Sequence, residues 1–200
     1  MIAIIDYGMG NLRSVEKALE ALGIESKITD DPQEIRDSKA IILPGVGAFP
    51  AAMKRIKEKE LDKLLKEEVA KGKLLLGICL GMQLLFESSD EVEFTEGLGF
   101  IQGHVKKLQI KEKVPHMGWN NLKFNEKSPF LNGIDEGSYV YFVHSFYADT
   151  KMENVNAYTE YEVVVPAVVS NKNVVGFQFH PEKSGTIGLK MLENIKEWIK

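Results

Sequence analysis

The stretch KLLLGICLGMQ, residues 73–83, decides how this chain folds. Its first six residues form a short apolar run of the kind that makes a strand buried on both faces of a sheet. Gly77 and Gly81 then bracket Cys79 two residues away on either side, a pattern typical of a tight turn from a strand into a helix, which we expect over 81–88. A side chain at either glycine would clash in such a turn. Cys79 would then project over the carboxyl edge of the sheet, where open α/β folds bind ligands.

The segments before this turn alternate in the same way. Apolar strands are expected over 2–5, 24–28 and 40–43, and helical spacing covers Asn11–Leu22 and a charged region over 49–71. Strands that are apolar throughout and alternate with helices predict a parallel sheet covered on both faces.

The chain changes character after residue 98. Strand-like segments joined by short turns are expected at 99–109, 119–124, 138–147, 155–160, 163–170 and 173–179. The region from Val163 to Phe179 reads as a hairpin, and an amphipathic helix is expected over Thr186–Trp198. The prediction is therefore α/β: one domain over 1–200 with a mostly parallel sheet, flanking helices and antiparallel additions.

Composition excludes several classes of protein. The chain has 200 residues, 44% apolar and 27% charged, and a formal net charge of −4, so charge gives no case for nucleic acid or an anionic membrane as partner. No apolar run approaches the ~20 residues that cross a bilayer, and the first residues lack the features of a signal peptide. One cysteine permits no internal disulfide. We expect a globular cytoplasmic protein.

Cys79 has two readings: a small buried apolar side chain or a catalytic nucleophile. A nucleophilic thiol needs a general base, and the base needs a group to orient it. His180 follows the apolar run 174–179 and so lies at a strand end. Glu182 stands two residues further on, which in extended chain puts both side chains on one side. The sequence thus predicts a Cys79–His180–Glu182 triad, with the N–H group of Leu80 as the first oxyanion donor.

Several segments carry a resemblance to a known family: DYGMGNL at 6–12, PGVGAF at 44–49, CLGMQLLF at 79–86, PHMGWN at 115–120, YFVHS at 141–145 and GFQFHPEKS at 176–184. The chain resembles the class I, triad-type glutamine amidotransferases. Among these it is most similar to glutaminase subunits that serve imidazole glycerol phosphate synthesis in the histidine pathway.

The resemblance implies that Cys79 attacks the side-chain amide of L-glutamine. Gln83 and backbone groups of Ser145 and Phe146 would hold the amino-acid end of the substrate. The second oxyanion donor would come from the loop of Gly45, Val46 and Gly47. Many relatives have Tyr where this chain has Phe146. The change has no consequence if the position works through its backbone, and it weakens substrate affinity if a phenol hydroxyl matters.

The resemblance also implies a partner, a (β/α)8-barrel cyclase that receives the ammonia and forms a heterodimer with the glutaminase. Neither a metal nor a cofactor is implied. The positions that would face the cyclase or the ammonia path are Asn11, Met117, Trp119, Tyr141 and Lys183. Trp119 and Tyr141 could equally be core aromatics, and Lys183 a solvated cation.

Three alternatives stay open at this point. The chain could be a triad glutaminase of another biosynthetic pathway, or a binding subunit that keeps the fold without the chemistry. A Cys peptidase or esterase on the same turn is disfavoured by Gln83 and by the glycine loop at 45–47.

Overall fold

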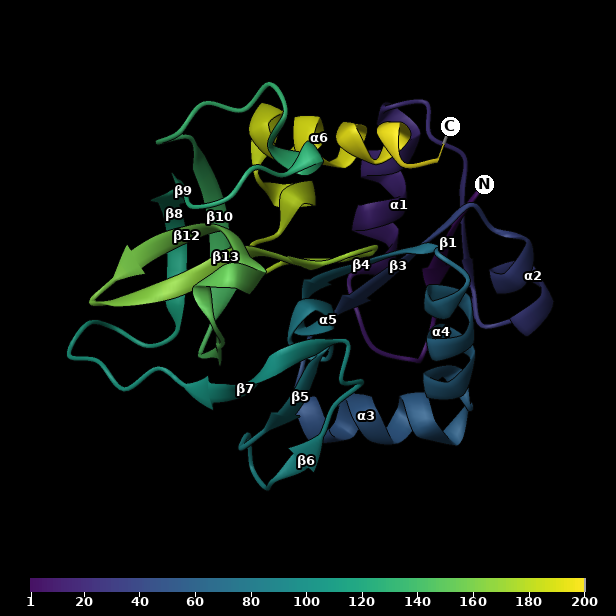
Figure 1. Ribbon diagram of the computed structural model, residues 1–200, viewed down its shortest axis with the longest axis horizontal. Coiled ribbons are helices and arrows are strands. Elements are labelled where there is room, and N and C mark those ends of the chain that lie inside the picture. Colours follow the sequence, from purple (N-terminus) through teal and green to yellow (C-terminus); the bar gives the residue numbers. More distant parts are fainter. Residues whose placement is uncertain (200) are drawn as a thin grey trace.

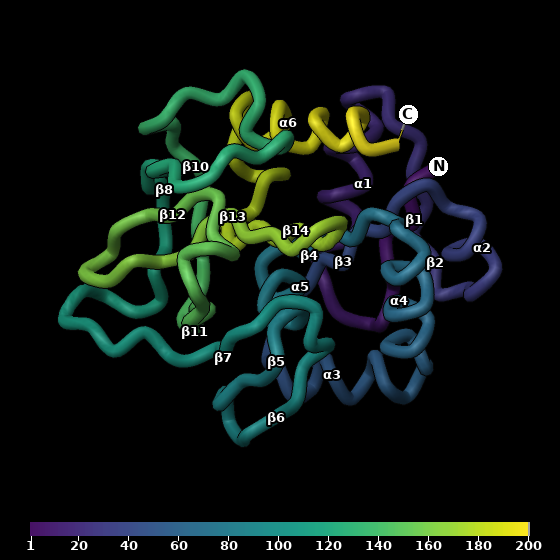
Figure 2. The backbone as a smooth tube through the Cα atoms, in the orientation of Figure 1, coloured from purple at the N-terminus to yellow at the C-terminus, as the bar shows by residue number. Residues whose placement is uncertain are grey.

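The computed structural model describes residues 1–199. Its centre is an eight-stranded sheet in the order β2-β1-β3-β4-β14-β13-β12-β9. The first five strands in that order are parallel (Figures 1 and 2). They are β2 (Ser26–Thr29), β1 (Ile2–Ile5), β3 (Ala40–Gly45), β4 (Leu74–Cys79) and β14 (Val174–Phe177). The prediction of a parallel core is confirmed.

Helices cover both faces of this parallel region because alternate strand residues point to opposite sides. Ile2 and Ile4 pack in one core with α1 (Leu12–Ala21) and α6 (Gly185–Glu193). The intervening Ala3 and Ile5 pack in a second core with the helices on the other face. Those helices are α3 (Phe49–Glu58) and α4 (Leu61–Ala70), and Figure 1 shows the two layers above and below the sheet. A short α2 (Pro32–Asp37) is capped by Asp31, whose carboxylate accepts from two backbone N–H groups.

Antiparallel strands extend the sheet and flank it. The hairpin predicted from Val163 to Phe179 is confirmed, because β13 (Val163–Asn171) pairs antiparallel with β14. The sheet ends in β12 (Val155–Tyr161) and β9 (Lys123–Phe124). The remaining strands form a pair, β8 (His116–Asn121) with β10 (Tyr139–His144), and a four-stranded sheet of β11 (Phe146–Asp149), β7 (Ile101–Lys107), β5 (Phe86–Ser89) and β6 (Thr95–Glu96). Single 3-10 turns lie at Pro129–Leu131, Met152–Asn154, Pro181–Lys183 and Asn194–Glu197.

The prediction of a helix over 81–88 is wrong. The helix after Cys79, α5, covers only Leu80–Gln83, and the chain then enters β5. Leu84, Leu85 and Phe86 are completely buried, so no face of a helix there would be free for solvent. Their carbonyl groups instead accept backbone hydrogen bonds from residues 98–101, a pairing that spacing within the segment does not reveal.

Other boundaries differ less. The charged region 49–71 forms two helices rather than one, and the second strand begins two residues later than expected. The expected C-terminal helix is α6 followed by a 3-10 turn. Across residues 1–199, none of the helices is both long and apolar enough to span a bilayer.

Candidate functional site

The turn at Cys79 is strained and closely packed. Cys79 ends β4 with φ 54° and ψ −111°, a conformation that non-glycine residues adopt rarely and at a cost of order 1–3 kcal/mol. A Cβ on Gly81 would lie 1.7 Å from the Leu43 carbonyl oxygen, and one on Gly77 would lie 2.6 Å from that of Gly81. The glycine spacing thus has the steric cause that the sequence predicted.

The neighbours of β4 in the sheet supply the other groups. β14 runs parallel to β4, with Phe177 beside Ile78, so His180 emerges at the same edge as Cys79. On the other side, Gly45 of β3 pairs with Cys79 itself. Three adjacent strand ends therefore bring the nucleophile, the histidine and the glycine loop together, although they lie far apart in the chain.

His180 and Glu182 form a buried pair. The Nδ1 atom of His180 lies 2.7 Å from Oε1 of Glu182, and the two side chains are 3% and 1% exposed. Asn11 also donates to this Oε1 through Nδ2, at 3.2 Å, and its own amide is oriented by the hydroxyl of Ser14. Nε2 of His180 is buried and has no hydrogen-bond partner among residues 1–199, which leaves that nitrogen for the sulfur or a substrate.

The electrostatics of His180 favour its charged form. Burial alone lowers the pKa of His180, but the adjacent Cys79 sulfur and the Glu182 carboxylate outweigh it and raise the pKa to about 9. At neutral pH the imidazole is therefore protonated beside the Cys79 sulfur.

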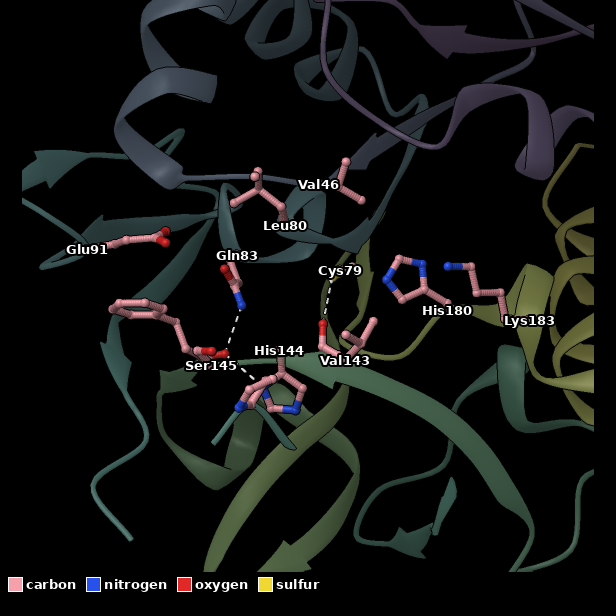
Figure 3. A pocket seen from close by; sticks show the side chains of 13 residues that line it. Val46, Cys79, Leu80, Gln83, Glu91, Val143, His144, Ser145, His180 and Lys183 are labelled. Atoms are coloured by element: carbon pink, nitrogen blue, oxygen red, sulfur yellow. Dashed lines mark hydrogen bonds between the residues drawn. The ribbon is translucent and has the colours of Figure 1, made fainter. Parts of the chain in front are cut away.

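A pocket of about 380 Å³ opens beside Cys79 (Figure 3). Gln83 lines it and is held by both amide hydrogens: Nε2 donates to the Phe146 carbonyl at 2.9 Å and to Oε1 of Gln178 at 3.1 Å. Oε1 of Gln83 remains as its only polar atom for a ligand. Phe146 takes part in these contacts through its carbonyl oxygen, so the absence of a tyrosine hydroxyl costs none of them. Val46, Gly47, Leu80, Ser145 and Lys183 also line the pocket.

The glycine loop is anchored just before it enters the pocket. The hydroxyl of Tyr7 donates to the Pro44 carbonyl at 3.0 Å, and a Cβ on Gly45 would lie 2.4 Å from that hydroxyl oxygen. Burial, and then the nearby Cys79, raise the pKa of Tyr7 above its ordinary value, so the hydroxyl stays a donor. Val46 is 43% exposed and Gly47 has φ 109°.

Glu91, Val143 and His144 line the pocket but were not predicted as site residues. Glu91, in the loop between β5 and β6, points into the pocket opposite His180 (Figure 3), and its Oε2 accepts from the N–H group of Phe49 at 2.8 Å. Burial raises the pKa of Glu91. Val143 and His144 lie in β10, and the Val143 carbonyl is 3.9 Å from the Cys79 sulfur. Glu91 stands in the acidic segment 90–96, and nothing in its spacing distinguishes it from the other carboxylates there.

The residues expected to face a partner lie in two places. Met117 and Trp119 of β8 are 61% and 55% exposed, and Trp119 packs edge-on against Tyr141 of β10 with ring centroids 6.0 Å apart. Lys183 is exposed beside the pocket. Asn11, in contrast, is partly buried and bonded to Glu182. In the described part of the chain, residues 1–199, no group of three or more His, Cys, Asp or Glu side chains is placed to hold a metal ion.

Comparison with known proteins agrees with this geometry. The family described as class-I glutamine amidotransferase matches residues 3–197. The chain belongs to this family. It is 56% identical over 196 residues to the imidazole glycerol phosphate synthase subunit HisH of Bacillus mycoides (strain KBAB4), with 98% of this chain and 94% of that protein covered. It is 52% identical to the HisH subunit of Bacillus cytotoxicus, with coverage of 100% and 96%. This glutamine amidotransferase is therefore of the HisH type, a glutamine-hydrolysing subunit of histidine biosynthesis, as the sequence predicted.

Solved structures show the same fold. A glutamine amidotransferase crystal structure superimposes with a TM-score of 0.78 at 21% identity, covering 100% of this chain and 99% of that one. The structure of PurLQS from Thermotoga maritima gives a TM-score of 0.77 at 25% identity, covering 100% and 98%. The amidotransferase fold class is confirmed.

Proposed function

We propose that this chain hydrolyses L-glutamine at Cys79 and passes the ammonia to a (β/α)8-barrel cyclase, which uses it to form imidazole glycerol phosphate and aminoimidazole carboxamide ribotide. The observation that carries the proposal is the buried Cys79–His180–Glu182 arrangement at the wall of a pocket. A chain with one cysteine and no capacity for an internal disulfide fits a cytoplasmic site for this reaction.

The first half-reaction forms a thioester. The Cys79 thiolate attacks the carboxamide carbon, and the carbonyl oxygen becomes an oxyanion. The N–H group of Leu80 can donate to that oxygen, because the first N–H groups of a helix have no intrahelical partner. A second donor is expected from Gly45, Val46 or Gly47. Nε2–H of His180 then protonates the departing nitrogen, the C–N bond breaks, and ammonia leaves.

The second half-reaction restores the enzyme. His180, now neutral, removes a proton from water through Nε2, and the water oxygen attacks the thioester carbon. The C–S bond breaks, glutamate leaves and the thiolate–imidazolium pair forms again. Glu182 accepts from Nδ1–H throughout, so the ring keeps one orientation in both steps.

The pocket has acceptors for the amino-acid end of glutamine. Oε1 of Gln83 can accept from the α-ammonium group, since both hydrogens of its amide are already used. The carboxylate of Glu91 adds a negative charge on the same side of the pocket (Figure 3). Backbone groups of Ser145 and Phe146 complete this side.

The transfer of ammonia requires a partner surface near the site. Met117 and Trp119 supply exposed apolar and aromatic side chains, Tyr141 is half-buried against Trp119, and Lys183 adds a cation at the pocket, a composition that fits an interface. Asn11 would act there through Glu182, which it contacts.

A coupled assay with the cyclase subunit tests the proposal. We expect glutamate formation by the chain alone to be slow and to rise about ten-fold or more with the cyclase and its ligand, because Val46 resists the peptide orientation that would present a donor and partner binding would shift that equilibrium. An electrophilic glutamine analogue should label Cys79, and glutamine should block the labelling. Equal rates with and without the cyclase would overturn the proposal that partner binding shifts the loop at 45–47. Absence of labelling at Cys79 would favour a non-catalytic subunit.

A further inference from the structure

Two buried histidines that take no part in the triad face each other across β8 and β10. His116 and His144 are paired in the strand register, and Nδ1 of His116 lies 3.0 Å from Nε2 of His144. His116 is stacked between the rings of Phe142 and Tyr161, with centroids 4.7 and 4.1 Å away. Buried polar side chains placed in this way are costly unless each hydrogen bond is made, so the direction of each bond can be worked out.

The bond to a carbonyl group fixes the first ring. Nδ1 of His144 lies 2.9 Å from the Phe146 carbonyl oxygen, which can only accept, so Nδ1 carries the hydrogen. Burial, with a smaller effect from His116, lowers the pKa of His144 to about 3, so the ring is neutral at pH 7. Its Nε2 must then accept, and the donor is Nδ1 of His116.

The same reasoning fixes the second ring. Burial lowers the pKa of His116 to about 4, so this ring is neutral too and its Nε2 accepts. The donor is Nδ2 of Asn120, 3.3 Å away, whose amide is oriented by bonds from Nδ2 to the Glu160 carbonyl and from the Asn121 N–H group to Oδ1. Among residues 1–199, neither ring is hydrogen-bonded to a carboxylate that would favour its charged form. A chain of bonds thus runs in one direction, from Asn120 to His116, to His144 and to the Phe146 carbonyl.

This chain ends at the group that holds Gln83. The Phe146 carbonyl accepts two bonds, from Nδ1 of His144 and from Nε2 of Gln83, both 2.9 Å long. Figure 3 shows the His144 ring and the Gln83 amide reaching this segment from opposite sides. Without the His144 donor the carbonyl could turn toward other partners, and of the two bonds that orient the Gln83 amide the one to Gln178 would remain.

We infer that His116 and His144 are positioning residues for glutamine binding: a neutral histidine pair that fixes the Phe146 carbonyl and, through it, the substrate-facing oxygen of Gln83. The inference rests on the proposed function, since it assigns Gln83 to the α-ammonium group of glutamine. Both ring nitrogens of His144 and both of His116 are already used in the chain of bonds, so the pair acts on affinity rather than on bond breaking.

Variants that remove or keep the donor test this role. In the complex with the cyclase, His144→Leu should raise the KM for glutamine about ten-fold while kcat changes by less than about three-fold, the effect of one lost buried bond. His144→Asn places an amide N–H near the Nδ1 position and should return the KM to within about three-fold of the parent. His116→Leu should likewise raise the KM for glutamine, and His116→Asn should return it toward the parent value. His104→Leu, at a histidine outside the pocket, is the matched control and should leave the KM unchanged.

The controls separate this inference from the proposed function. Alkylation of Cys79 by iodoacetamide, which needs no glutamine pocket, should proceed at the parent rate in each histidine variant, whereas protection by glutamine should weaken. Equal KM values for His144→Leu and the parent, or no rescue by asparagine, would overturn the positioning role. Failure of the parent chain to hydrolyse glutamine would instead overturn the proposed function.

A spectroscopic measurement keeps the inference testable if the leucine variants do not fold. With 15N-labelled histidine at pH 7, both His116 and His144 should give the shifts of neutral rings protonated at Nδ1, the less common tautomer in water. Asn120→Ala, at the partly exposed start of the chain of bonds, should shift the His116 signals first. A cationic ring, or a ring protonated at Nε2 alone, would contradict the assigned direction.

Discussion

Residues 1–199 contain two constellations, each made of a nucleophile-type side chain, a histidine and a carboxylate. In the first, Cys79 faces His180, which is bonded to Glu182. In the second, the Ser88 hydroxyl lies 2.9 Å from Nδ1 of His104, whose Nε2 lies 2.7 Å from Oδ2 of Asp90. The order of groups is the same, so the chemistry of three side chains alone does not distinguish the two.

Their settings differ in three ways. His180 and Glu182 are 3% and 1% exposed, whereas His104 and Asp90 are 32% and 64% exposed, so solvent screens the second pair. Cys79 has strained backbone at a strand end, whereas Ser88 lies within β5 on ordinary extended backbone. The pocket beside Cys79 includes neither Ser88 nor His104. We therefore expect catalytic competence to depend on the turn, the burial and the pocket, whereas the second constellation joins β5 to β7.

Removal of the two nucleophile-type atoms should give the largest contrast. Cys79→Ala should lower glutamine-dependent synthesis by at least about 10³-fold, because no thioester can form. Synthesis from added ammonia should persist in the complex with the cyclase. Ser88→Ala should leave both activities within about two-fold of the parent. Loss of the ammonia-dependent reaction in Cys79→Ala would show that the cysteine is needed for structure, and a large loss in Ser88→Ala would break the comparison.

The comparison also shows which parts of the fold and of the site could be predicted from the sequence. The strands β1, β3 and β4 were predicted within two residues of their bounds, because a fully apolar run between turns has few other uses. The elbow and the His180–Glu182 spacing were local signals, and the structure places these residues together at one sheet edge.

The features that the sequence did not predict depend on pairing between distant segments. The sequence predicts a helix where β5 forms because the pairing partners of β5 lie in other segments, in β6, at Gly97 and in β7. The contact of Asn11 with Glu182 spans 171 residues, and the pairing of His116 with His144 depends on the register of β8 and β10. The single domain over 1–200 and the partner-facing roles of Met117 and Trp119 remain predictions.

The next largest contrast is expected when the carboxylate of each constellation is replaced by its amide. Glu182→Gln should lower glutamine hydrolysis about 10²-fold, because the amide oxygen can still accept from His180 and Asn11 while the charge that stabilises the imidazolium is gone. Asp90→Asn, the matched change at the exposed site, should have no measurable effect. Steady-state glutaminase rates at a fixed cyclase concentration measure both. An Asp90→Asn variant as impaired as Glu182→Gln would show that burial is not what separates the sites.

The smallest effect concerns the dependence of stability on pH. The pKa of His180 is about 9 in the folded chain, above the ordinary histidine value of 6.5, so the folded state binds this proton more tightly than the unfolded state. By itself this proton stabilises the folded chain below pH 6.5, and the stabilisation is lost as the pH rises through 9. NMR of 15N-labelled histidine should therefore show the His180 ring losing its proton near pH 9 rather than near 6.5.

The histidine responsible can be identified by substitution. His180→Gln should remove the signals that titrate near pH 9, whereas His104→Gln, the matched change at a partly exposed histidine outside the pocket, should leave them in place. A His180 ring that is already neutral at pH 7 in the parent chain would contradict the raised pKa. In that case Cys79 would start each cycle as a thiol, and His180 would have to act as a base before the attack on glutamine.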